Sequence, residues 1–150
     1  MATNAPLSEF ALFRNIPEEL LDKVAALGKE ESFTQGNVIF REGDLADDLH
    51  FLLAGEIVLK VKLTSRPESI TVSAVSQQYE SFGWSGIVPP YHYTASAICE
   101  TDCKVLTING KGFMTLLEEN PSAGFIVMKR LTELVASRLR NSRQALLKTL

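Results

Sequence analysis

Residues 32–62 read SFTQGNVIFREGDLADDLHFLLAGEIVLKVK, a stretch in which short apolar runs are separated by turn residues. Gly36, Gly43 and Gly55 lie in three of these turns, where glycine is favoured because it adopts backbone conformations that other residues avoid. Every second residue from Ile57 to Leu63 is apolar, while two lysines occupy the opposite face. This alternation is typical of a half-buried strand, so the stretch predicts short strands joined by tight turns.

The same alternation continues downstream of this stretch. Apolar residues alternate at 70–74, and two further strands are expected at residues 94–99 and 104–108, joined by a turn at Thr101-Asp102. Many short strands at this spacing favour a β-roll, a jelly-roll-like antiparallel barrel, over residues 30–108.

Helices are expected on both sides of the roll. In the N-terminal segment, Pro17 occupies the first turn of a helix, where proline is favoured. In the C-terminal segment, Asn109 caps a short helix and Asn120-Pro121 begins a long one. The sequence therefore predicts an α+β fold in a single domain, with a helical lead-in at residues 1–29, the β-roll at 30–108 and the C-terminal helices at 109–150.

The long helix carries more apolar surface than one sheet needs. We expect it to pair with a second copy and form a homodimer through Met128, Leu131, Val135 and Leu139, which share one face. A partner protein is the other occupant considered. We interpret the basic residues of this helix as a solvated face; they are Lys129, Arg130, Arg138, Arg140, Arg143 and Lys148.

The composition excludes several classes of protein. The chain has 150 residues, of which 45% are hydrophobic and 22% charged, and these values are ordinary for a globular domain. A net charge of −3 argues against nucleic-acid binding, which favours a basic surface. No apolar run reaches the roughly 18 residues of a membrane span. The N-terminus has no export signal, so we expect a cytoplasmic protein that does not bind membranes.

The sequence offers little for catalysis. Metal-dependent jelly-roll enzymes need several histidines and a carboxylate, whereas this chain has only His50 and His92. His50 lies in an apolar strand and is interpreted as a structural histidine, while Cys99 and Cys103 are interpreted as small buried hydrophobes. No serine or cysteine shows a nucleophile signature. We therefore expect no enzyme activity, no catalytic residue, no metal site and no cofactor.

Residues 81–97, SFGWSGIVPPYHYTASA, fit neither the strand nor the helix period. Gly83 and Gly86 allow tight turns, and Ser85 is expected to cap one helical turn that Pro89-Pro90 ends. Unpaired N–H groups at such a turn favour an anion. The alternative is a capped hairpin whose aromatic residues fill the core, the residues being Phe82, Trp84, Tyr91, His92 and Tyr93.

The order of these elements resembles the cyclic-nucleotide-binding domain of the Crp-Fnr type over nearly the whole chain. Gly36, Gly43 and Gly55 fall at the spacing of the family's turn glycines. Residues 99–121, CETDCKVLTINGKGFMTLLEENP, resemble its closing strand and short helix. Transcription factors of this family place a helix-turn-helix after the long helix, whereas this sequence stops at Leu150, so direct DNA binding is not expected.

The resemblance implies that residues 81–97 form a phosphate-binding cassette, the name used below for this segment. In the family, amides after a Phe-Gly pair cradle the cyclic phosphate, a glutamate accepts from the ribose hydroxyl and an arginine pairs with the phosphate. Here Phe82-Gly83 is present, but Trp84 stands at the glutamate position. The arginine position falls on Tyr93, or on His92 if the two prolines shift the register.

These departures predict weak or no ordinary cAMP or cGMP binding. An arginine–phosphate bond is worth about 1.5–3 kcal/mol, so its loss weakens binding by roughly ten- to a hundredfold. An arginine from elsewhere, such as Arg41 or Arg66, would contradict this prediction if it reached into the site and neutralised a bound phosphodiester. The expected ligand-binding residues are Phe82, Gly83, Trp84, Ser85, Gly86, Ile87, His92, Tyr93 and Thr94.

Three outcomes stay open for the pocket. In the first, the pocket is filled by Trp84, Tyr91 and Tyr93, which leaves a domain without a ligand. In the second, the pocket accepts a flatter or more apolar ligand whose carboxylate or phosphate meets the surviving amides. In the third, a cyclic nucleotide binds weakly through His92. The sequence thus predicts a cytoplasmic regulatory or sensor module that signals through its C-terminal helix. The alternative is a ligand-free dimerisation or protein-interaction domain.

Overall fold

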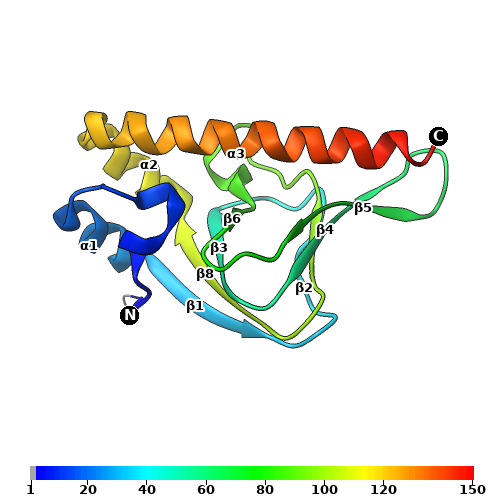
Figure 1. Cartoon of the computed structure of the whole chain (residues 1–150), viewed down its shortest axis with the longest axis horizontal. Coiled ribbons are helices and arrows are strands. Elements are labelled where there is room, and N and C mark those ends of the chain that lie inside the picture. Colours follow the sequence, from blue (N-terminus) through cyan, green and yellow to red (C-terminus); the bar gives the residue numbers. More distant parts are fainter. Residues whose placement is uncertain (1–2) are drawn as a thin grey trace.

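Two four-stranded antiparallel sheets pack on each other around a shared core (Figure 1). The computed structural model describes residues 3–150. Its strands are β1 (Gly28–Phe33), β2 (Val38–Phe40), β3 (Asp48–Ala54), β4 (Ile57–Lys62), β5 (Ser69–Val75), β6 (Ser81–Phe82), β7 (Ser96–Cys99) and β8 (Cys103–Asn109). One sheet has the order β1-β8-β3-β6 and the other β2-β7-β4-β5. Helices precede and follow the roll in the sequence, so the predicted α+β fold is confirmed.

The predicted turns and strand faces of residues 32–62 are confirmed. The three turn glycines all have positive φ, between 87° and 95°. At Gly55 a side chain is excluded for two reasons. The positive φ disfavours any residue with a side chain, and a Cβ atom would collide with the carbonyl oxygen of Asp102. In β4, Ile57 and Leu59 are buried whereas Lys62 is exposed. Cys99 and Cys103 are free and buried, as expected of small hydrophobes.

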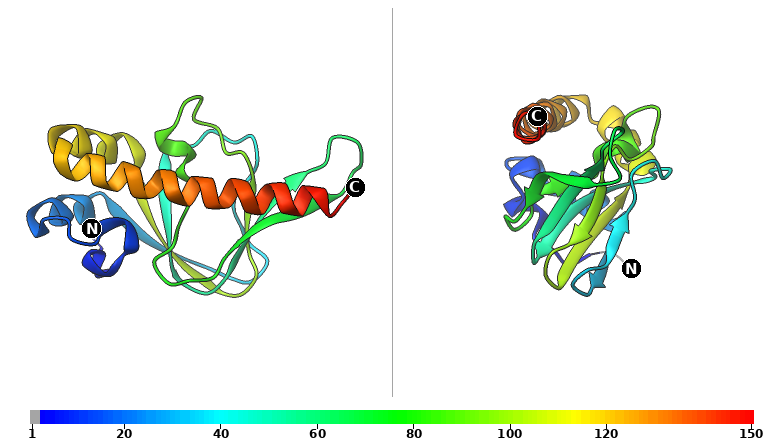
Figure 2. Two further views of the ribbon diagram at one scale, coloured as in Figure 1. Left: turned by 45° about the horizontal axis from the view of Figure 1, so that its top comes forward. Right: turned by 90° about the vertical axis from the view of Figure 1, so that its right-hand side faces the viewer.

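Helical segments cover one end of the roll, and a long helix crosses it (Figures 1 and 2). Asn109 caps the short C-terminal helix as predicted, because its side-chain oxygen accepts a hydrogen bond from the Gly112 N–H at 2.8 Å. The helical elements are η1 (Leu7–Glu9), η2 (Ala11–Phe13), α1 (Glu18–Ala26), η3 (Trp84–Ile87), α2 (Gly110–Glu119) and α3 (Pro121–Leu147). No helix within residues 3–150 combines the length and apolar character needed to cross a membrane.

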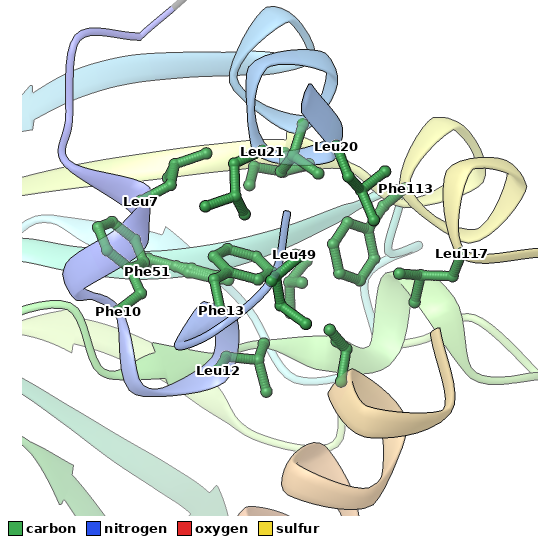
Figure 3. Packing of buried hydrophobic residues seen from close by; sticks show 14 of the residues in the cluster. Leu7, Phe10, Leu12, Phe13, Leu20, Leu21, Leu49, Phe51, Phe113 and Leu117 are labelled. Atoms are coloured by element: carbon green, nitrogen blue, oxygen red, sulfur yellow. The ribbon is translucent and has the colours of Figure 1, made fainter. Parts of the chain in front are cut away.

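Strand β3 contributes to two cores because its side chains alternate between its two faces. Leu49 and Phe51 point to the helical side, where they pack with Phe10, Phe13 and Phe113 in a cluster of aromatic and leucine side chains (Figure 3). Leu52 belongs instead to the core inside the roll. A strand buried on both faces is continuously apolar, which explains why LHFLL contains only one polar residue.

Helix α3 has an inner face that packs on the domain and an exposed outer face, on which Leu139 and Leu146 border a groove with Leu63 and Arg66. On the inner face, Leu131 is 3% exposed within the helical core and Met128 packs partly against it. Leu131 therefore belongs to the domain's own core and is not available for the expected dimer contact. Val135 and Leu139 do lie on the exposed side, at 36% and 67%.

The interpretation of the basic residues of α3 as a solvated face is wrong for Arg138. Arg138 is 7% exposed because it lies four residues after Leu134 and seven after Leu131, helical spacings that place it on the same inner face. Lys129, Arg140, Arg143 and Lys148 are exposed as expected, whereas Arg130 is half-buried and donates to the carbonyl oxygens of Leu12 and Arg14.

Candidate ligand site

The cassette begins with β6, which pairs with β3 next to His50. Gly83 follows with a φ of 65°, in the left-handed region that favours glycine. A Cβ atom at this position would lie 2.6 Å from His50 Cδ2 and 2.8 Å from Phe40 Cε2. The predicted glycine turn is therefore present, and it brings the cassette against β2 and β3.

The helical turn after Gly83 differs from the prediction in its start. It runs from Trp84 to Ile87 and no side chain caps it, so Ser85 lies inside the turn and does not cap it. The reason is that Gly83 itself makes the reversal from β6 into the turn. Gly86 packs against the backbone of Asp48, where a Cβ atom would lie 2.5 Å from the carbonyl oxygen.

A small cavity of about 50 Å³ lies between the cassette, the roll and α3. Drug-sized ligands occupy pockets of roughly 300–1,000 Å³, so this cavity has no room for a nucleotide. Its walls come from the start of the cassette, from residues 93–95 near the end of the cassette, from the roll and from α3. The lining residues are Gly83, Trp84, Ser85, Tyr93, Thr94, Ala95, Phe40, Leu59 and Arg138.

Tyr93 closes the site from the side of the roll. Its side chain is 7% exposed, and its ring stacks on Phe40 with centroids 3.8 Å apart and planes 7° from parallel. Its hydroxyl group forms a 2.8 Å hydrogen bond with His50 Nε2. The ring of His50 in turn stacks on Phe82. Tyr93, one of the two residues expected at the family's arginine position, is thus one of four packed aromatic rings, which we call the aromatic plug (Phe40, His50, Phe82 and Tyr93).

Both polar groups of the plug are uncharged near neutral pH. Burial lowers the pKa of His50 to about 3, and burial together with nearby aspartates raises the pKa of Tyr93 above its usual range. His50 is buried, as the structural interpretation requires, although its Nδ1 atom has no hydrogen-bond partner. The plug therefore offers no positive charge to a phosphate.

The other two aromatic rings expected in the pocket, Trp84 and Tyr91, are placed differently. Trp84 lines the cavity and packs partly against the helical core, while Tyr91 is 44% exposed. The expectation that both rings fill the pocket with Tyr93 is therefore wrong for Tyr91, and the rings that pack on Tyr93 are those of Phe40 and His50.

The structure brings together only part of the predicted ligand-binding set. Gly83, Trp84, Ser85, Tyr93 and Thr94 line the cavity, and Phe82 lies behind it in the plug. The remaining three do not line it: Gly86 and Ile87 border a separate cavity beside α2, and exposed His92 donates from Nδ1 to the carbonyl oxygen of Pro90 at 2.9 Å.

Arg138 is the site residue that the sequence reasoning missed. It reaches the cavity from α3, and its Nη2 atom donates to Glu80 Oε2 at 2.9 Å and to the Ser81 carbonyl oxygen at 2.8 Å. Its Cζ atom lies 5.3 Å from the centroid of the Trp84 ring, a cation–π arrangement. The sequence signal that could have found Arg138 is its helical spacing from Leu131 and Leu134, which places position 138 on the inner face of α3.

The two arginines named as possible replacements lie elsewhere. Arg41 borders a separate groove with Lys60 and Lys62. Arg66 lies 3.8 Å from Glu68 and donates to the carbonyl oxygen of Thr149. A guanidinium does line the site, but it comes from α3 and already has a carboxylate partner. Within residues 3–150, no group of three histidine, cysteine, aspartate or glutamate residues is placed to hold a metal ion.

Comparison with known proteins identifies the family of this fold. The model of the cyclic nucleotide-binding domain matches residues 30–120. The potassium channel SKOR of Arabidopsis thaliana is 31% identical over 114 residues, which are 75% of this chain and 13% of that protein. The cyclic AMP receptor protein of Thermus thermophilus is 24% identical over 132 residues, which are 87% of this chain and 58% of that protein.

A solved structure agrees with these matches. The crystal structure of a candidate cyclic nucleotide-binding protein from Geobacter metallireducens superimposes with a TM-score of 0.73 and 33% identity, covering 87% of this chain and 92% of that one. The chain spans less than two thirds of the length of the two curated relatives above. What those longer proteins do as a whole is therefore not carried over to this chain.

Proposed function

The chain belongs to the cyclic nucleotide-binding domain family, and on that premise we propose that it is a non-catalytic, cytoplasmic regulatory module with weak or no ordinary cAMP or cGMP binding. We propose further that it signals through α3. The observation that carries the proposal is the aromatic plug, because it buries Tyr93, one of the two residues that the resemblance places at the family's arginine position.

Opening the site for a nucleotide would require Tyr93 to leave the plug. That movement loses its hydrogen bond to His50, its stacking on Phe40 and its buried apolar area. Together these interactions amount to about 3–5 kcal/mol. A protein that must first make such a change binds its ligand about two to four orders of magnitude more weakly. The cation that lines the site, Arg138, already pairs with Glu80.

Helix α3 is the element suited to transmit a signal, because one of its residues lines the site. Arg138 connects α3 to Glu80 and Ser81 immediately before the cassette turn. A movement of Glu80 or Ser81 therefore acts on α3 through the Arg138 side chain. Allosteric coupling needs such an element that contacts the site and lies in more than one arrangement.

The outer face of α3 supports the proposed homodimer. Phe125, Leu139 and Leu146 are 70%, 67% and 44% exposed and recur at multiples of seven residues, with Val135 between them. This spacing is that of a two-helix seam. We therefore place the dimer contact on Val135 and Leu139, with Phe125 and Leu146 in addition, and not on Leu131.

Titration calorimetry of the wild-type protein with cAMP and cGMP tests the proposed function. We expect no saturable heat at micromolar nucleotide, and saturation in that range would contradict the proposal.

The second candidate function, a ligand-free dimerisation or protein-interaction domain, is favoured by the same plug. The two candidates differ in whether any small molecule changes α3. A true cyclic-nucleotide binder that uses His92 has no support, because His92 does not line the cavity.

A further inference from the structure

A groove of about 690 Å³ crosses the outer face of the sheet β2-β7-β4-β5. It is lined by Val38 in β2, Ile98 in β7, Lys60 in β4 and Ser69 in β5. Strands in a sheet lie about 4.8 Å apart, so a groove across four of them is about 14 Å long. An extended chain covers that length with about four or five residues.

The floor of the groove is apolar. Val38 pairs with Ile98 across β2 and β7, and Ile98 pairs with Val58 in β4. The neighbours of Ile98 in its strand, Ala97 and Cys99, belong to the core inside the roll, so Ile98 and its cross-strand partners point outward. The outer face of an antiparallel sheet is usually polar. A row of three half-buried, branched apolar side chains on that face therefore favours a surface that a partner covers.

The rim of the groove is positively charged. Arg41, Lys60 and Lys62 line it together with a single acidic residue, Glu42. All ion pairs found within residues 3–150 lie elsewhere, so none of the three cations has a carboxylate partner there. In a chain with a net charge of −3, such a cluster creates a local positive field that attracts an anionic partner.

The backbone beneath these cations is fixed by Glu42. Its Oε1 atom accepts a hydrogen bond from the Lys62 N–H at 3.0 Å, and its own N–H donates to Ser96 Oγ at 2.9 Å. The two bonds fasten the loop that carries Arg41 to β4 and β7. The two sides of the groove are thus held in place before a partner arrives, which lowers the entropic cost of binding.

We propose that this groove binds an extended acidic segment of a partner protein, whose carboxylates meet Arg41, Lys60 and Lys62 and whose apolar side chains rest on Val38 and Ile98. Nucleic acid would use the same cations, but single strands also stack their bases on aromatic side chains, and no aromatic residue among those described lines the groove. The groove shares no lining residue with the small cavity of the cassette, so this interaction is independent of the proposed function.

Fluorescence anisotropy of a short labelled peptide tests this interaction. The probe alternates glutamate with valine, and the control peptide has lysine in place of every glutamate. Each peptide is titrated with the wild-type protein at low ionic strength. We expect saturable binding of the acidic probe that weakens as salt is added, because exposed charges are screened, and no saturable binding of the control peptide.

Variants locate the binding on this groove. Lys60→Glu/Lys62→Glu is expected to weaken probe binding by about tenfold or more. Lys111→Glu/Lys129→Glu makes the same change of net charge at two exposed lysines outside the groove and is expected to leave binding nearly unchanged. Val38→Thr/Ile98→Thr keeps every charge and the branched shape of the floor but makes it polar, and is expected to weaken binding severalfold.

Three results would overturn the proposed groove interaction. The first is an acidic probe that does not bind saturably, and the second is an equal loss of affinity in Lys60→Glu/Lys62→Glu and in Lys111→Glu/Lys129→Glu. The third is a single-stranded oligothymidylate that binds more tightly than the probe and is insensitive to Val38→Thr/Ile98→Thr, which would assign the cations to nucleic acid. Saturable probe binding that both groove variants weaken and the control variant retains supports the acidic segment.

Discussion

The small cavity has two walls that are built in different ways. The wall formed by the roll is the aromatic plug, in which neutral rings stack and one buried hydrogen bond joins Tyr93 to His50. The wall formed by α3 is a single charged side chain, Arg138, with an ion pair on one edge and an unused donor on the other. The first wall is held by packing and the second by electrostatics. The difference suggests that the plug stabilises the fold, while Arg138 links the site to α3.

The largest expected effect comes from emptying the plug. Phe82 is fully buried, and Phe82→Ala is expected to lower the free energy of unfolding by about 3–5 kcal/mol. The measurement is denaturant unfolding followed by far-UV circular dichroism. A loss well below about 1 kcal/mol would show that the plug collapses around the vacancy and contributes little packing.

The charged wall is expected to matter less for stability. Arg138→Met leaves Glu80 without its partner, but the Glu80 side chain is 23% exposed and can be hydrated. We expect a loss of about 1–3 kcal/mol, together with faster hydrogen exchange in residues 138–147 of the variant than in the same residues of the wild type. Arg140→Met is the matched control and is expected to change stability by less than about 0.5 kcal/mol. Equal exchange rates in wild type and Arg138→Met would contradict the role given to this residue.

The plug predicts how stability changes with pH. The pKa of His50 is about 3 in the folded protein and near its ordinary value of 6.5 when unfolded. Between these two values the unfolded state binds the extra proton, so stability falls as the pH falls below about 6.5, with a slope approaching 1.4 kcal/mol per unit.

The variant His50→Gln retains a hydrogen-bonding side chain but does not titrate. Its unfolding free energy should therefore fall less steeply than that of the wild type as the pH falls below about 6.5. The variant His92→Gln removes an exposed histidine and is the control, with the slope retained. Identical pH profiles for wild type and His50→Gln would show that His50 is not held neutral in the plug.

The smallest effect on stability is expected outside both walls. Leu139 is 67% exposed on the outer face of α3, so Leu139→Glu should change the unfolding free energy of the monomer by less than about 0.5 kcal/mol. If the proposed dimer uses this face, the same substitution converts it to a monomer in light scattering after gel filtration. A wild-type protein that is already monomeric would contradict the dimer proposal.

The scaffold could be predicted from the sequence because its signals are local. The turn glycines at 36, 43 and 55 and the alternation in β4 are visible within a few residues, and the structure confirms them. The departures of the cassette at Trp84 and Tyr93 were also visible. These local patterns carry the fold and the position of the site.

The contents of the site could not be predicted in the same way because its contacts are long-range. Tyr93 meets His50 and Phe40 across more than 40 residues, and no periodic pattern records such a contact. Arg138 lies 57 residues from Ser81, whose carbonyl oxygen it binds. The charge of Arg138 favours a solvated face, although its helical spacing from Leu131 places it inside.

The most direct test of the account is the cAMP affinity of Tyr93→Ala measured beside that of the wild type by titration calorimetry. The account predicts no saturable binding to the wild type at micromolar nucleotide and an affinity for Tyr93→Ala that is stronger by at least about tenfold, because the variant no longer has to move the ring. Micromolar binding to the wild type, with no gain in the variant, would contradict the claim that Tyr93 closes the site.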